Sequence, residues 1–269
     1  MKYQGIYFMK KTLIALAVAA SAAVSGSAMA WTEGGTGGSI NLGGTLTPVV
    51  KSVPWHVNTG AAVNDLNASL DKGQKSVAFN VSKAIPVLGM RTADKTAFRG
   101  SAGLTPAINY NGALDTAKFS ANKAPLTLDI LDAGGTKIGQ LKTKLTAAGV
   151  GSRLFDSGYK DAAMLYAKDS WNAFMGGLST TVDGVDVSGG TSLINTLFSG
   201  AEENFILQGA SLNGDAPMAT HFGSDTIMYS GAYASAISAQ EGVTITLDQP
   251  AGADSIVWKA SLPVTVSYQ

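Results

Sequence analysis

Histidine, cysteine and clustered carboxylates build most catalytic and metal sites, and this sequence holds few of them. Cysteine is absent, and His56 and His221 are the only histidines. Neither histidine belongs to an H-E-x-x-H pattern, and the chain has no G-x-S-x-G elbow or G-x-x-x-x-G-K-[ST] loop. Asp183 and Asp186 lack the remaining ligand spacing of a calcium loop. We therefore expect no catalytic, cofactor or metal site, and no enzyme activity.

Aromatic side chains are the other residues that could do chemistry, because they stack on sugar rings as well as anchoring cores. Trp55, Trp171 and Trp258 are spread along the chain together with several tyrosines. We take Tyr166 and Trp171 as the first candidates for a glycan contact, because both fall in a segment that interrupts the strand pattern. The alternative is that these aromatic residues are core anchors, which is their more frequent role.

The first thirty residues have the pattern of a secretory signal peptide. A basic start at Met9-Lys10-Lys11 precedes an apolar run over residues 12–24, and Ala28-Met29-Ala30 supplies an A-x-A cleavage site. We predict that residues 1–30 are removed during export through the periplasm. Residues 1–8 read as an upstream start-site extension, with a longer basic region as the alternative.

The chain that remains after cleavage is weakly acidic and has the composition of a β-protein. It has 239 residues and, after the loss of three lysines, a net charge of −3, which excludes a polybasic nucleic-acid binder. Abundant glycine and only 14% charged residues suit many strands joined by tight turns. Residues 49–269 can form one large β-domain, since all-β folds of this length often stay undivided.

An N-terminal extension, residues 31–48, carries an isolated alternating strand. Ile40, Leu42, Gly44 and Leu46 fall in one phase, and polar residues or glycine fill the other. The three apolar side chains could contribute roughly 4.5 to 9 kcal/mol of burial. The sequence alone leaves two interpretations open, an edge strand paired within its own chain and a segment that pairs with another molecule.

Further strands are predicted along the rest of the chain by alternation and β-propensity. A turn at Asp132-Ala133-Gly134-Gly135 joins two of them in an antiparallel hairpin. The predicted strands cover Ser76–Val81, Ile85–Leu88, Pro106–Tyr110, Leu126–Leu131, Lys137–Thr146, Thr226–Tyr229, Tyr233–Ser238, Val243–Asp248 and Ile256–Tyr268.

The segment at about 152–215 reads as a partly helical insertion between strands. Asp156 or Ser157 could cap a helix that ends at Gly176-Gly177. Two shorter helical patches are predicted at residues 192–198 and 201–208.

The last predicted strand has one apolar face, made by Leu262, Val264, Val266 and Tyr268. The chain ends inside this strand, which leaves room for one more strand supplied from elsewhere. In one interpretation the strand borders a groove and pairs with a chaperone; in the other it is an ordinary C-terminal core strand. Both can hold, because a core face and a pairing edge use different groups.

Several motifs, in order along the chain, resemble those of the FaeG-like fimbrial subunits, major or minor, of the chaperone-usher thin fimbriae of enteric bacteria. The resemblance covers the whole chain and is weakest between Asp183 and Asp225. The motifs are the signal peptide followed by Trp31-Thr32, the segment from Gly38 to Thr47, the Leu88-Gly89-Met90-Arg91-Thr92 turn, Gly135-Thr136-Lys137-Ile138-Gly139, Gly176 to Val182, and Trp258 to Tyr268.

The resemblance implies a pilin-type, incomplete immunoglobulin-like β-sandwich that lacks its last strand. The implied function is a structural subunit of a surface fimbria that contributes to cell adhesion and assembles by donor-strand exchange. Ile40, Leu42, Gly44 and Leu46 would then form the donor strand. The implied partners are a periplasmic chaperone, an outer-membrane usher and other fimbrial subunits, with no nucleic acid.

A second hypothesis is a glycan-binding adhesin subunit of the same fimbria, with a host glycan as receptor. The family and the aromatic residues of the predicted insertion motivate it. A secreted hydrolase is a third class, and it is weak because no nucleophile–base pair is evident in the sequence.

Overall fold

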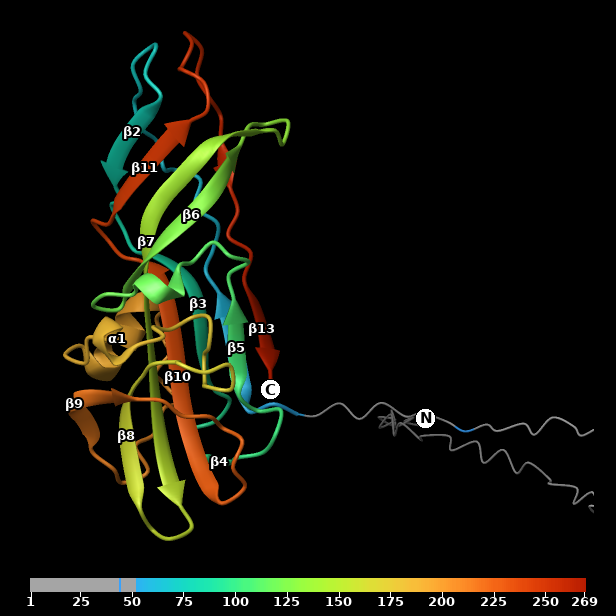
Figure 1. Cartoon of the computed structure of the whole chain (residues 1–269), viewed down its shortest axis with the longest axis vertical. Coiled ribbons are helices and arrows are strands. Elements are labelled where there is room, and N and C mark those ends of the chain that lie inside the picture. Colours follow the sequence, from blue (N-terminus) through green and yellow to red (C-terminus); the bar gives the residue numbers. More distant parts are fainter. Residues whose placement is uncertain (1–43, 45–51) are drawn as a thin grey trace, which may run out of the picture. The chain divides into compact units, whose positions relative to one another are not determined.

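The computed structural model describes Gly44 and residues 52–269, and this part is built mainly of strands (Figure 1). It has one α-helix, α1 (Gly190–Leu197), and two short 3-10 helices, η1 (Thr116–Lys118) and η2 (Val182–Gly184). The strands are β1 (Trp55–Thr59), β2 (Ser76–Asn80), β3 (Ile85–Thr92), β4 (Phe98–Arg99), β5 (Pro106–Asn109), β6 (Lys123–Leu131), β7 (Lys137–Phe155), β8 (Lys160–Leu165), β9 (Leu212–Met218), β10 (Ile227–Ile237), β11 (Gly242–Leu247), β12 (Lys259–Ala260) and β13 (Thr265–Tyr268).

A large mixed sheet with the central order β1-β3-β10-β7-β11-β2 forms one layer, and β5 with β13 forms a separate two-stranded sheet. The strand pairs are antiparallel except for β8 and β9, which run parallel. The predicted hairpin is confirmed as β6 and β7, although β7 is longer than expected and continues to Phe155. The predicted fold class, a mainly β sandwich of pilin type, is therefore confirmed.

Strand β10 shows why this sheet is covered on both faces. Its aromatic side chains, Tyr229 and Tyr233, are buried in the main core, whereas Ala232, Ala234 and Ala236 alternate with them and face the other way. The alanines pack with Ile194 and Leu197 of α1 and with residues of β7 and β8 in a second core cluster. Small side chains on that face let the helix approach the sheet closely.

The main core lies between the large sheet and the β5–β13 sheet and is rich in aromatic rings. Trp55 and Phe222 have ring centroids 5.1 Å apart, and Phe174 lies 5.3 Å from Tyr233. The indole Nε1–H of Trp55 donates a hydrogen bond of 2.7 Å to the carbonyl of Leu104, which satisfies its buried donor. These contacts join β1, β10 and the loop before β5 into one interior.

A hydrogen-bonded tyrosine pair sits in the same core. The hydroxyl of Tyr110 lies 2.8 Å from that of Tyr233 and 2.7 Å from Ser235 Oγ. Tyr233 also donates to the carbonyl of Gly177 at 3.1 Å. Burial raises the pKa of Tyr110 to about 12 and raises that of Tyr233 as well.

The tyrosine pair predicts a loss of stability at alkaline pH. Because the folded-state pKa of Tyr110 is raised, its contribution is complete below about pH 10 and declines as pH rises toward 12. A shift of this size corresponds to a few kcal/mol, at about 1.4 kcal/mol per pKa unit. Urea unfolding at several pH values should show this decline, and Tyr110→Phe should reduce its slope. An unchanged slope in the variant would contradict the assignment.

One helix predicted from the sequence, over the residues from Asp156 to Gly176, is wrong. The structure has strand β8 there, followed by an irregular loop. Strand β8 pairs with β7 on one side and with β9 on the other, and its residues Ala162 to Leu165 are all buried. Because successive side chains are buried on both faces, the run lacks the apolar–polar alternation of a half-exposed strand, and its apolar residues mimic a helical spacing. Tertiary pairing overrides the local pattern here.

The two shorter helical patches have different outcomes. Helix α1 confirms the patch at 192–198, while residues 201–208 form turns and no helix. Whether residues 152–215 are an insertion stays a prediction, and the segment contains the end of β7 as well as β8 and α1. The predicted turn at 88–92 is also wrong, because these residues lie inside β3 and pair with β1 and β10.

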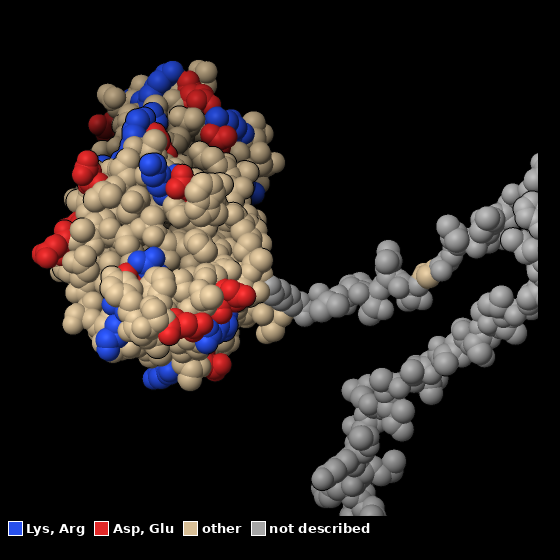
Figure 2. Space-filling model, turned by 60° about the horizontal axis from the view of Figure 1, so that its bottom comes forward, with Lys and Arg blue, Asp and Glu red and all other residues tan. Residues whose placement is uncertain are grey.

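The surface carries charge of both signs in small groups. In Figure 2 acidic and basic side chains are interspersed, and much of the visible face is uncharged. Among residues 52–269 there is no helix that is long and apolar enough to cross a membrane. The predicted signal peptide lies outside the described residues and stays a prediction.

Candidate functional site

The C-terminal segment forms an apolar face that is only partly covered. Leu262, Val264, Val266 and Tyr268 are all half-buried, and the residues between them are exposed. All four pack against the main core cluster. The predicted alternation is present in this segment.

The prediction of one continuous strand over Ile256–Tyr268 needs correction. The structure has two short strands, β12 paired with β6 and β13 paired with β5. Pro263 lies between them and has no backbone N–H to offer a ladder. The segment changes its partner strand at this point, while its side chains keep alternating.

Strand β13 is an edge strand in the part of the chain that the structure describes. One side pairs with β5, so that Val266 lies opposite Ile108 and Tyr268 opposite Pro106. The ladder continues at Gln269, whose N–H donates to the carbonyl of Thr105 at 2.9 Å. Among the described strands, none pairs with the other side of β13. Burial raises the pKa of the Tyr268 hydroxyl, which agrees with a ring that reaches the core.

Strand β1, an edge strand of the large sheet, has a similarly uncovered side chain. Val57 pairs with Met90, so both side chains lie on the sheet face that borders the main core. Met90 is 1% exposed and Val57 is 43% exposed. Among residues 52–269, no strand covers this inward-facing valine at the β1 edge.

The ends of the two edge strands are linked through the loop before β5. Trp55 donates to the carbonyl of Leu104, and the next residue, Thr105, is hydrogen-bonded to Gln269 beyond β13. We call Val57 together with Leu262, Val264, Val266 and Tyr268 the open edge. It offers apolar side chains, and no strand in the described part of the chain pairs with the outer backbone groups of β1 and β13, which is what an added strand needs.

The segment around Gly176 holds the opposite side of β5 in place. Ile108 donates its N–H to the carbonyl of Met175 at 2.8 Å, and Phe174 donates to Pro106 at 2.7 Å. Gly176 itself has φ +83°, a conformation that favours glycine. Strand β5 therefore lies between this loop and β13, and the loop fixes the position of the open edge.

The two aromatic residues chosen as glycan candidates lie in the loop between β8 and η2. Tyr166 is half-buried, and its N–H donates to the carbonyl of Met218 at 3.1 Å. Trp171 is 58% exposed. Whether either residue contacts a sugar stays a prediction.

Of the four donor-strand residues predicted from the sequence, Ile40, Leu42, Gly44 and Leu46, the structure describes only Gly44. Gly44 is exposed, and the other three lie outside the described residues. Their role as a donor strand stays a prediction.

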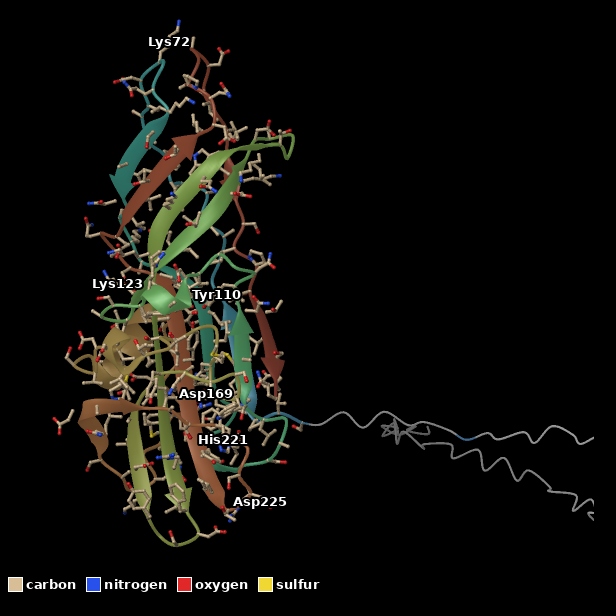
Figure 3. All side chains as sticks on the ribbon, in the orientation of Figure 1. Lys72, Tyr110, Lys123, Asp169, His221 and Asp225 are labelled. Atoms are coloured by element: carbon tan, nitrogen blue, oxygen red, sulfur yellow. The ribbon has the colours of Figure 1, made fainter. Side chains whose placement is uncertain are left out.

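The two histidines lie on surface positions. His56 is exposed on β1, and His221 is exposed and accepts a hydrogen bond of 3.0 Å from the Gly223 N–H (Figure 3). Among residues 52–269, no three His, Asp or Glu side chains are grouped so that they could hold a metal ion. The sequence analysis did not identify Val57 as a site residue. The signal that could have identified it is the alternation of side chains in Trp55–Thr59, but this strand is too short for the alternation to stand out.

The open edge and the sandwich define a pilin-like β-protein. The chain belongs to the family described as fimbrial, major and minor subunit, whose model matches residues 9–269. The resemblance noted in the sequence is therefore confirmed.

Three curated relatives illustrate this membership. The chain is 32% identical to K88 fimbrial protein AB of Escherichia coli and 31% identical to K88 fimbrial protein AC, in each case over 97% of this chain and all of the relative. It is 34% identical to the F41 fimbrial protein of the same species over 59% of each chain. The protein is thus a fimbrial subunit of a non-enzymatic structural family, whose members polymerise and are displayed on the cell surface as fimbriae.

Proposed function

We propose that this chain is a structural fimbrial subunit whose sandwich is completed by a strand from another subunit. Residues Ile40, Leu42, Gly44 and Leu46 of one copy would pair along the open edge of the next. The observation that carries the proposal is the half-exposed, inward-facing row on the C-terminal segment, where alternate apolar side chains border an unpaired edge.

The energetics favour a shared strand over an isolated subunit. Burying a large apolar side chain contributes about 1.5 to 3 kcal/mol, and a typical domain is stable by only about 5 to 15 kcal/mol. An uncovered row of apolar residues beside free N–H and C=O groups also invites aggregation. A periplasmic chaperone would cover this edge after export. At the outer-membrane usher, the donor strand of another subunit would then replace the chaperone.

Size analysis of the exported chain, with and without a co-expressed chaperone, tests this proposal. With the chaperone we expect a defined complex, and without it we expect oligomers or aggregates. A well-folded monomer of the mature chain, obtained without any partner, would overturn the proposal.

A peptide with the sequence of residues 39–47 should stabilise the open subunit. At a peptide concentration about 100 times the Kd, binding adds roughly 2.7 kcal/mol, or a rise in Tm of about 5 to 10 °C for a chain of this size. Thermal unfolding of the chaperone-released chain measures the effect. A peptide in which Leu42 is replaced by Asp is the matched control and should give no rise.

A host-glycan adhesin is the second candidate function. The observation in its favour is Trp171, because a tryptophan that is 58% exposed on a loop is available for stacking on a sugar. A glycan array probed with assembled fimbriae, with and without Trp171→Ala, tests it. Silence on the array with the native fimbriae would count against this function.

A further inference from the structure

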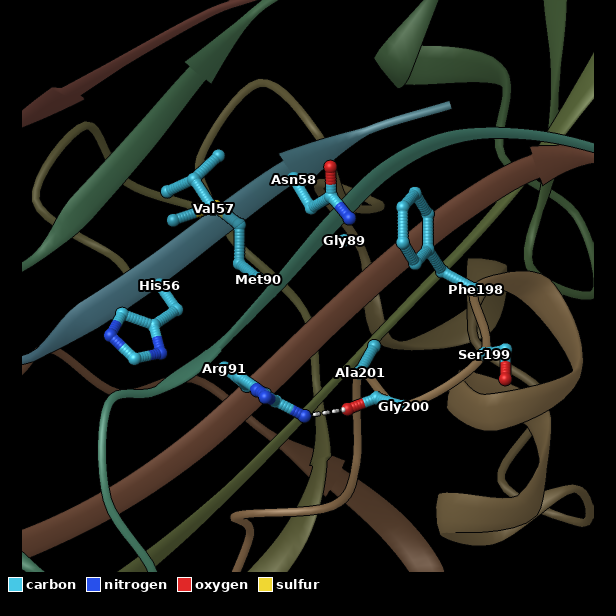
Figure 4. A pocket seen from close by; sticks show the side chains of 10 residues that line it. All are labelled: His56, Val57, Asn58, Gly89, Met90, Arg91, Phe198, Ser199, Gly200 and Ala201. Atoms are coloured by element: carbon cyan, nitrogen blue, oxygen red, sulfur yellow. Dashed lines mark hydrogen bonds between the residues drawn. The ribbon is translucent and has the colours of Figure 1, made fainter. Parts of the chain in front are cut away.

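A hollow lies on the outer face of β1 and β3, the face that points away from the main core. Its volume is about 330 Å³, and the turn from Phe198 to Ala201 forms its far wall (Figure 4). In the β1–β3 register His56 lies opposite Arg91 and Asn58 lies opposite Gly89. Directly paired residues share a sheet face, so these side chains border one surface.

Phe198 forms the apolar wall of this hollow. Its ring packs against Gly89 so closely that a Cβ at that position would lie 2.7 Å from the ring. The ring is half-buried, and Ser199 beside it is exposed. The hollow therefore has one aromatic wall and a polar border.

Arg91 brings directed hydrogen-bond donors to the border. Its Nη1 donates to the carbonyl of Gly200 at 2.7 Å (Figure 4). The same nitrogen donates to Glu203 Oε2 at 2.6 Å. Among the described residues, none accepts a hydrogen bond from its Nε or Nη2, and the side chain is 30% exposed. A guanidinium with two free donor groups on one side matches a carboxylate.

The local charge also favours an anion. Arg91 and Lys95 both approach Glu203, with N···O distances of 2.6 Å and 3.8 Å, so two cations face one carboxylate. Hydrogen bonding to Arg91 lowers the pKa of Glu203, which keeps this carboxylate ionised. His56 and Asn58 are exposed across the hollow and can hydrogen-bond to hydroxyl groups.

We propose that this hollow binds an acidic sugar residue, with its carboxylate on Arg91, its ring against Phe198 and its hydroxyls toward His56 and Asn58. The volume lies at the lower end of small-molecule sites, which suits a single ring. A simple carboxylate would use only the Arg91 side of the hollow. The site is separate from Trp171, which does not line the hollow.

Ligand-observed NMR and calorimetry on the purified full chain, held in assembled fimbriae, test this proposal. The probes are glucuronic acid, N-acetylneuraminic acid, glucose and succinate. We expect at least one acidic sugar to bind roughly tenfold more tightly than glucose and succinate, as charge-assisted and ring contacts combine. Equal binding of succinate and both acidic sugars, or no binding of either acidic sugar, would overturn the proposal.

Three variants assign the binding to this hollow. Arg91→Lys keeps the positive charge but loses the paired N–H donors of the guanidinium, and it should weaken binding about tenfold. Glu203→Gln releases Arg91 and should strengthen binding by roughly threefold. The matched control is Arg99→Lys, which alters a similar surface pair, Arg99 with Asp156 at 2.6 Å, and should leave binding unchanged.

Two further results would contradict the site. One is an equal loss in Arg91→Lys and Arg99→Lys. The other is a loss in Trp171→Ala with no change in Arg91→Lys, which would move the sugar to the loop after β8. Fibre incorporation of Arg91→Lys should stay normal, so failure of this proposal is distinguishable from failure of the proposed strand exchange.

Discussion

Replacing Val266 by aspartate should abolish the acceptance of a donor strand. Val266 lies on β13 opposite Ile108, half-buried and facing the core. A carboxylate at this position would have to enter the apolar face as the incoming strand covers it, and burying an unpaired charge costs several kcal/mol. We therefore expect the response to the 39–47 peptide to weaken by at least about 100-fold and incorporation into fimbriae to cease.

Ser267→Asp is the matched control for this experiment. Ser267 is the next residue on the same strand, but it is exposed and points away from the core. It receives the same charge at nearly the same place, so it should keep most of the peptide response. Equal responses of the two variants would show that the inward face of β13 does not receive the donor strand. The Tm of each variant in its chaperone complex, measured without peptide, reports any effect on the subunit itself.

Gly176→Ala should cause the largest loss of stability among single small substitutions in the loop that supports β5. A Cβ at Gly176 would lie 2.1 Å from the carbonyl oxygen of Ile108, and the φ of +83° is strained for alanine. The clash is with backbone, so it can be relieved only by moving β5 or the loop. We expect a loss of about 3 to 5 kcal/mol in the free energy of unfolding.

Gly158→Ala separates the clash from the backbone strain. Gly158 has nearly the same φ, +86°, but a Cβ there would have no atom within 4 Å. Its cost should be limited to about 1 kcal/mol of conformational strain. Urea unfolding of both variants measures the difference. Similar costs at the two positions would contradict the inferred packing of Gly176 against β5.

The positions of β2, β6, β11 and α1 could be predicted from the sequence because each has a strong local signal. The Asp132–Gly135 turn and its flanking alternation predicted the β6–β7 hairpin, for example. The failure at β8 has the opposite cause. A strand buried on both faces has no polar alternation, so Ala162–Leu165 could not be distinguished from a buried helical turn by periodicity.

The candidate site also combines features that the sequence predicts with features that only the structure shows. The alternation of Leu262, Val264, Val266 and Tyr268 was visible in the sequence, because the period of a strand is local. Their half-burial, beside an edge that no described strand pairs with, was not visible in the sequence, because exposure depends on which strands lie nearby. The exposure of Val57 likewise requires the register with Met90, which joins residues 33 positions apart.

The sequence by itself determined a mainly β fold, because turn residues, alternation and composition act over short distances, and the resemblance of its motifs to fimbrial subunits indicated the family. The tertiary structure decided which strands lie at the edges, how β12 and β13 divide the C-terminal segment, and which groups surround the hollow at Arg91. These features arise from contacts between residues far apart in the chain. Such contacts depend on the packing of whole layers, which no local pattern encodes.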